Sequence, residues 1–140
     1  MTFYSAKIAR IVILNKDNVL FCRHRKKNYY FLPGWNVGYG EKAETTLQRE
    51  IKREMNYFAK KCSHIGAFQS EHEKLSGRKE TQYDLIFKVE TEEIGSPPAD
   101  ERIEFIWKHQ DTLANYDILP KKLKPALINW FENKKVFWAR

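Results

Sequence analysis

Apolar and polar stretches alternate along the first third of the chain. Residues 7–14 form an apolar run rich in β-branched side chains, residues 15–18 are polar, and residues 19–23 resume the apolar pattern. Two such runs joined by a polar turn predict a β-hairpin. A third short strand is predicted over residues 29–32, directly before a Pro-Gly pair.

The middle and the end of the chain repeat these patterns. Strands are predicted over residues 62–70, 81–90 and 103–107, where aromatic and β-branched residues gather. The polar stretch 71–80 and the Pro- and Gly-containing stretch 91–101 are predicted loops. A final amphipathic helix is predicted over residues 120–131, whose apolar positions are Leu123, Leu127, Ile128, Trp130 and Phe131.

A helix is also predicted after the glycine-rich turn that ends at Gly40. Its apolar stripe comprises Ala43, Leu47, Ile51, Met55 and Phe58. At about 100° per residue, Glu50 projects at the edge of this stripe and Glu54 projects inside it. Four residues are close to one helical turn, so the two carboxylates point the same way.

Strands and helices are therefore mixed throughout, which predicts an α/β domain of α+β or layered α/β/α type. The chain has 140 residues, of which 42% are hydrophobic, so a single domain over 1–140 with one packed core is expected. No apolar run approaches the roughly 20 residues of a membrane span, and the N-terminus lacks a signal-peptide core. These features predict a cytoplasmic protein without a membrane partner. Cys22 and Cys62 lack metal-ligand spacing and are expected to be reduced.

The two helical glutamates suggest a cation site. A backbone carbonyl from the turn that contains Gly34, Gly38 and Gly40 would complete an all-oxygen site suited to Mg²⁺ or Mn²⁺. Such ions bind phosphate oxygens, so a diphosphate-containing substrate is indicated. Two ordinary alternatives remain: Glu54 pairs with a neighbouring arginine, or the helix rolls until both acids face water.

The spacing of several residues resembles the sequence box of the Nudix hydrolases. The matching residues are Leu32, Pro33, Gly34, Glu41, Arg49, Glu50, Ile51 and Glu54. The segment from Leu32 to Tyr57 is thus similar to a degenerate Nudix box, and the flanking elements extend the resemblance over nearly the whole chain. It implies an α/β/α sandwich with a mixed, curved sheet. It also implies a pyrophosphohydrolase that uses Mg²⁺ or Mn²⁺.

The resemblance implies roles for individual residues. Glu50 and Glu54 would be metal ligands and catalytic carboxylates, and the backbone carbonyl of Trp35 would be a further metal ligand. Arg49 would orient a carboxylate, and Glu41 would be a supporting ligand or a helix-start acid.

Four residues depart from the family pattern. Trp35 stands at a glycine position, where a left-handed backbone would cost about 1–2 kcal/mol. Arg53 replaces a glutamate of the metal-binding face, and Asn56 replaces a late glycine. Gln82 stands where relatives often carry a further glutamate. The acids that could replace that glutamate are Glu71, Glu73 and Glu80.

The net charge of +7 includes a basic cluster at residues 23–27. Most such clusters are solvated. The second strand, however, is predicted to end near the Leu-Pro-Gly turn, so Arg23 or Arg25 is a candidate phosphate contact. Tyr39 is a candidate for stacking on a nucleobase.

Two functions follow from these observations. In the first, the chain is a metal-dependent hydrolase of a nucleoside diphosphate linked to another group. In the second, it is a catalytically weak or inactive module that binds nucleotides or RNA, in which Arg53 replaces the cation. The sequence favours the hydrolase and does not determine the oligomeric state.

Overall fold

Eight strands pair into one sheet over the residues that the computed structural model describes, which are 4–73, 75–95, 97–98 and 102–140. The strands are β1 (Tyr4–Asn15), β2 (Asn18–His24), β3 (Tyr30–Phe31), β4 (Gly34–Asn36), β5 (Ser63–Glu73), β6 (Lys79–Glu90), β7 (Ile103–His109) and β8 (Phe137–Ala139). The helices are α1 (Ala43–Met55), the 3₁₀ helix η1 (Gln110–Asn115) and α2 (Leu123–Asn133).

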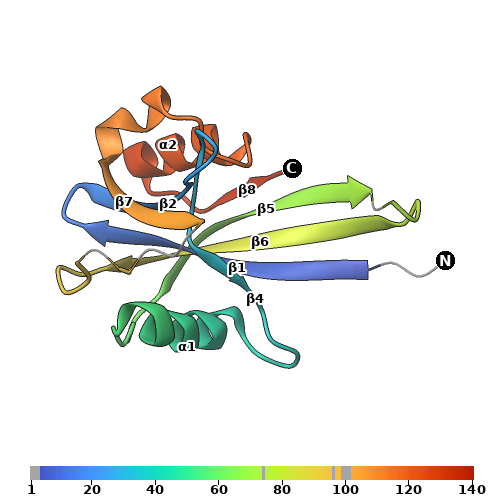
Figure 1. The fold of residues 1–140 in the computed structure, drawn as a ribbon, viewed down its shortest axis with the longest axis horizontal. Helices are drawn as coiled ribbons and strands as arrows, with labels where there is room; N and C mark the ends of the chain where they lie inside the picture. The colour runs from blue at the N-terminus through green and yellow to red at the C-terminus, as the bar shows by residue number, and fades with distance from the viewer. Residues whose placement is uncertain (1–3, 74, 96, 99–101) are drawn as a thin grey trace.

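The sheet is mixed and branched. Its main path runs β3-β2-β1-β6-β5-β8, with β4 paired to β1 and β7 paired to β2. β1 lies parallel to β6 along its length, while its opposite edge pairs first with β4 and then with β2. The predicted hairpin is confirmed, since Leu14 of β1 lies opposite Val19 of β2. The sheet is curved and does not close into a barrel (Figure 1).

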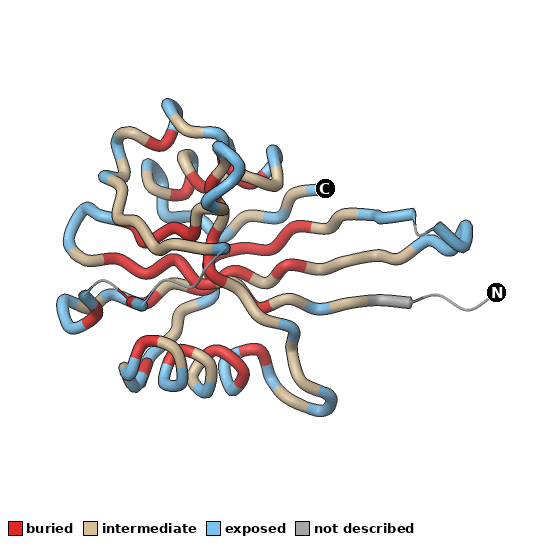
Figure 2. Tube along the Cα trace, in the orientation of Figure 1, coloured by how far each residue is buried: buried red, intermediate tan, exposed pale blue. Residues whose placement is uncertain are grey.

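Helices cover the two faces of this sheet. Figure 1 shows α1 on one side of the strands and α2 on the other. Each helix packs on its own apolar cluster: Leu47 and Ile51 of α1 join one, and Leu127 and Trp130 of α2 join the other. Buried residues gather where strands and helices overlap (Figure 2). The expected α/β/α sandwich is therefore confirmed.

Helix α1 follows the predicted stripe for most of its length. Ala43, Leu47, Ile51 and Met55 are buried as expected. The prediction for Phe58 is wrong, because the helix ends before it. Asn56 adopts a left-handed conformation with φ of 51°, and Phe58 lies beyond this turn with 62% of its surface exposed.

Other differences from the sequence predictions concern the strands. β5 and β6 continue their antiparallel pairing as far as Glu73 and Lys79, so residues 71–73 and 79–80, half of the predicted loop 71–80, are strand. Backbone hydrogen bonds extend this ladder although the side chains are polar. β4 and β8 were not predicted, because each is three residues long and pairs with a strand remote in sequence.

Parts of the two predicted loops lie outside the described residues. They are residue 74 of the loop 71–80 and residues 96 and 99–101 of the loop 91–101. Among the helices that the structure describes, none combines the length and the apolar character that crossing a membrane requires.

Candidate active site

The turn between β3 and β4 is held tightly against β1. The amide of Ile11 donates to the carbonyl of Pro33 at 3.0 Å, and Nη1 of Arg10 donates to the carbonyl of Leu32 at 2.9 Å. A Cβ atom on Gly34 would lie 2.9 Å from Cγ of Arg10, so a side chain does not fit there without displacement. This close packing places the start of β4, which pairs with β1, beside α1.

Trp35 follows this turn and contacts α1. Its indole Nε1 donates a hydrogen bond of 3.1 Å to Oε1 of Glu54. The backbone of Trp35 lies in β4, opposite Ala9 of β1, and it has no positive φ. The left-handed strain considered for a residue at this position is therefore absent, and the tryptophan ring reaches the acidic face of the helix.

Arg53 lies between the two predicted catalytic glutamates. Its Nη2 bonds to Oε2 of Glu50 and, at 3.0 Å, to Oε1 of Glu54. Its Nε also donates to Oε2 of Glu50 at 3.1 Å. The structure thus bears out the sequence alternative in which a neighbouring arginine neutralises Glu54.

A second arginine, Arg49, lies between Glu41, which precedes the helix, and Glu50. Nη1 of Arg49 donates to Oε2 of Glu41, and Nε of Arg49 lies 3.5 Å from Oε1 of Glu50. Thr46 donates from its hydroxyl to Oε1 of Glu41 at 3.2 Å. The Glu41 carboxylate packs directly over Gly38, where an added Cβ would collide with it. The glycine of this turn therefore makes room for the acid.

These contacts favour the ionised forms of Glu41 and Glu50. The hydrogen bond from Arg53, opposed by partial burial, lowers the pKa of Glu50 below its usual value. The hydrogen bond from Arg49 does the same to the pKa of Glu41. The side chain of Glu50 is 14% exposed and that of Glu54 is 30% exposed, so the two carboxylates are accessible from one side of the helix.

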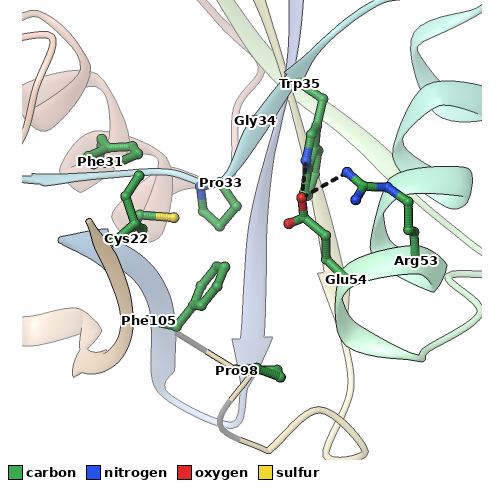
Figure 3. Close-up of a pocket in the computed structure, with 10 residues that line it drawn as sticks. Cys22, Phe31, Pro33, Gly34, Trp35, Arg53, Glu54, Pro98 and Phe105 are labelled. Carbon is green, nitrogen blue, oxygen red and sulfur yellow. Dashed lines mark hydrogen bonds and ion pairs between the residues drawn. The ribbon is translucent and has the colours of Figure 1, made fainter. Parts of the chain in front are cut away.

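A cavity of about 430 Å³ opens beside this cluster (Figure 3). Its lining residues are Cys22, Phe31, Pro33, Gly34, Trp35, Arg53, Glu54, Pro98, Ile103 and Phe105. Apolar side chains from the β3–β4 turn, β2 and β7 form one side, and the charged groups of α1 form the other. The cavity can hold a ligand that has an apolar or aromatic part and a charged part.

The NUDIX domain model matches residues 5–133 of the chain. The chain belongs to the NUDIX domain family. The chain is a Nudix hydrolase whose reaction class is cleavage of diphosphate bonds.

Solved structures of Nudix proteins share the fold at low sequence identity. A MutT protein from Bacillus halodurans matches with a TM-score of 0.79 and 16% identity over 95% of this chain and 86% of that chain. A MutT protein from Methanosarcina mazei Go1 matches with a TM-score of 0.71 and 17% identity, covering 96% and 99%. A UDP-X diphosphatase matches with a TM-score of 0.61 and 15% identity, covering 95% and 66%. Curated protein sequences contain no significant match.

The structure places the predicted phosphate contacts of this Nudix chain away from the cavity. The Arg23 guanidinium lies 3.4 Å from Glu104 and over the ring of Tyr30. Because side chains alternate along β2, it is the preceding residue, Cys22, that faces the cavity. Arg25 is exposed in the turn after β2, and its amide donates to the carbonyl of Arg102 at 2.8 Å.

Tyr39, the predicted stacking residue, is fully exposed in the turn before α1 and does not line the cavity. Gln82 lies at a different cavity, of about 450 Å³, where its Nε2 donates to Oδ1 of the buried Asp84 at 2.7 Å. Glu71 and Glu73 are exposed at the far end of β5. The structure therefore gathers Glu41, Arg49, Glu50, Glu54 and Trp35 and leaves the other predicted site residues elsewhere.

Sequence reasoning missed five residues of the cavity wall, namely Cys22, Phe31, Pro98, Ile103 and Phe105. For Cys22, Ile103 and Phe105 the signal was the alternation of side chains along β2 and β7, which assigns every second residue to the α1 face. That alternation could not be used without the pairing of β2 with β7, in which Cys22 lies opposite Phe105.

The acids suit a hard divalent ion in kind but not in their present arrangement. Carboxylate oxygens on successive turns are the donors that Mg²⁺ and Mn²⁺ prefer. Among the described residues, however, no group of three or more His, Cys, Asp or Glu side chains is arranged to hold a metal. Arg53 occupies the position between Glu50 and Glu54, so a metal would have to displace it.

Proposed function

We propose that this Nudix hydrolase cleaves the diphosphate bond of a nucleoside diphosphate linked to another group, with Mg²⁺ or Mn²⁺ at Glu50 and Glu54. The observation that carries the proposal is the pair of acids on successive turns of α1, beside a cavity with aromatic walls. The charged side of the cavity suits the metal and the diphosphate, and the apolar side suits the nucleoside.

Arg53 does not prevent this function, because it can leave the site. Its side chain is 62% exposed, and ion pairs of such exposed groups are weak. The long side chain can swing its guanidinium into water while its stem stays on the helix. The attraction of a doubly charged ion to two carboxylates then outweighs that of one arginine.

The chain's own residues would divide the work as follows. Glu50 and Glu54 would bind the metal, and Arg49 would orient Glu50 from the side of Glu41. The oxygen of Glu54 that faces the cavity is the candidate to accept a proton from the attacking water. When bound, the metal supplies charge neutralisation and polarises the phosphorus under attack.

A second candidate function has one observation in its favour. Arg53 bridges both acids and so acts as a substitute cation in the structure. A chain in which this bridge persisted would be a module that binds nucleotides or RNA with little hydrolysis. The two candidates differ in whether metal is required.

The test is a screen of nucleotide sugars, dinucleoside polyphosphates and nucleoside triphosphates with Mg²⁺, with Mn²⁺ and with a chelator. We expect hydrolysis that stops with the chelator and returns with either metal. Glu50→Gln and Glu54→Gln should each lower turnover by about two orders of magnitude or more, because each removes a metal-binding carboxylate. Glu92→Gln, which alters an exposed acid paired with Lys16, is the control.

Full activity in Glu50→Gln or Glu54→Gln would contradict the proposed site. Tight nucleotide binding without metal and without cleavage would favour the binding module.

A further inference from the structure

Glu54 receives two donors on the same carboxylate oxygen. Nη2 of Arg53 lies 3.0 Å from Oε1, and Nε1 of Trp35 lies 3.1 Å from it. Figure 3 shows the two donors approaching from the side of β4 and α1, with the second oxygen of Glu54 turned toward the cavity. One oxygen is thus held by the protein, and the other faces the space where a ligand would lie.

The two donors differ in how firmly they are themselves held. Arg53 is a flexible, mostly exposed side chain. Trp35 extends from a strand paired with β1, and its ring packs against the apolar cluster beneath α1. Displacement of Arg53 by a cation would therefore leave Trp35 as the fixed partner of Glu54.

We propose that Trp35 is a positioning residue for Glu54. Its indole N–H holds Oε1 and keeps Oε2 directed into the cavity when Arg53 moves away. Without this donor, the Glu54 side chain would be free to rotate toward Arg53 and away from the cavity. The catalytic part of this inference rests on the proposed function, whereas the hydrogen bond itself does not.

A glycine at this position could not make this contact, since it has no side chain. The indole N–H is a donor that carries no charge and does not titrate. It can therefore hold a carboxylate oxygen without bringing a positive charge that would repel a cation. A lysine or arginine at the same place would compete with the cation, as Arg53 does.

The first test needs neither metal nor substrate. The indole ¹H–¹⁵N resonance of Trp35 is assigned by its loss in Trp35→Phe. We expect this resonance to shift in Glu54→Ala, because the hydrogen bond is lost, and to shift much less in Arg53→Ala. An unchanged Trp35 resonance in Glu54→Ala would overturn the proposal.

The second test compares two tryptophans in matched surroundings. Trp107 packs against the same apolar cluster, and its Nε1 donates to the carbonyl of Gly95 at 3.0 Å. Trp35→Phe and Trp107→Phe each remove one indole hydrogen bond and keep an aromatic ring. Only the first removes a bond to a carboxylate.

We expect Trp35→Phe to weaken Mn²⁺ binding by about tenfold, as measured by calorimetry. We also expect it to lower kcat by about 10- to 100-fold with little change in KM. These changes are in the range for loss of a hydrogen bond to a charged group. Trp107→Phe should leave both quantities close to wild type. Equal Mn²⁺ affinity and equal kcat in the two variants would overturn the positioning role. If the protein hydrolyses nothing, the resonance and the Mn²⁺ titration still decide whether Trp35 positions Glu54. Failure of the positioning role can therefore be told apart from failure of the proposed function.

Discussion

Single residues decide how the acidic face of α1 behaves. Arg53 is the residue that most separates this chain from its family pattern, and the structure gives it both acids as partners. An arginine that bridges two carboxylates in this way satisfies them by charge-assisted hydrogen bonds. For the proposed function, a metal would have to displace this side chain to reach the two acids.

Arg53→Glu should therefore tighten Mg²⁺ or Mn²⁺ binding at least tenfold, because it removes the competing cation and adds an acid to the same face. Hydrolysis should rise as well. Calorimetric metal titration, with an activity assay alongside, measures both effects. The control is Lys52→Glu, which makes the same change of charge at the neighbouring exposed position. Equal metal affinity in wild type and Arg53→Glu would show that Arg53 does not compete.

At the scale of elements, the end of α1 sets the path of the chain away from the site. Asn56 adopts φ of 51° and ψ of 38°, and its amide donates to the carbonyl of Lys52 at 3.1 Å. Asparagine and glycine tolerate this left-handed conformation, whereas alanine does not. The substitution of a family glycine by asparagine is thus compatible with the helix end.

Asn56→Ala should lower the free energy of unfolding by about 1 kcal/mol through left-handed strain, whereas Asn56→Gly should match or exceed wild type. Denaturant unfolding monitored by circular dichroism measures the difference. Asn28→Ala, at an exposed position without positive φ, provides the control. Equal losses in Asn56→Ala and Asn28→Ala would show that the cap conformation contributes nothing.

At the scale of the whole molecule, the position of the site depends on strands that are remote in sequence. Arg10 of β1 bonds through Nε to the fully buried Asp84 of β6 and through Nη1 to the carbonyl of Leu32. Gln82 satisfies the other oxygen of Asp84. The Arg10–Asp84 ion pair therefore links the centre of the sheet to the turn that precedes Trp35.

Arg10→Met should lower the free energy of unfolding by about 3–5 kcal/mol, because it leaves the Asp84 charge buried without its partner. Adding Asp84→Leu should recover part of the loss, since the uncompensated charge is then gone. Glu92→Gln, which breaks an exposed pair with Lys16, should cost much less. Additive losses in the double variant would mean that the two side chains are not coupled.

The sequence by itself determined the features that depend on neighbouring residues. Periodicity located the hairpin of β1 and β2, the buried stripe of α1 up to Met55 and the shared direction of Glu50 and Glu54. Motif spacing indicated the Nudix family, which the family comparison then confirmed. These features follow from steric and spacing rules that act within a few residues.

The tertiary structure decided which side chains meet across the fold. It placed Cys22 rather than Arg23 at the cavity, because the pairing of β2 with β7 sets which face each residue occupies. It brought the Trp35 indole to Glu54, 19 positions along the chain. Such contacts depend on strand register and on the packing of a helix against a sheet, which local periodicity does not specify.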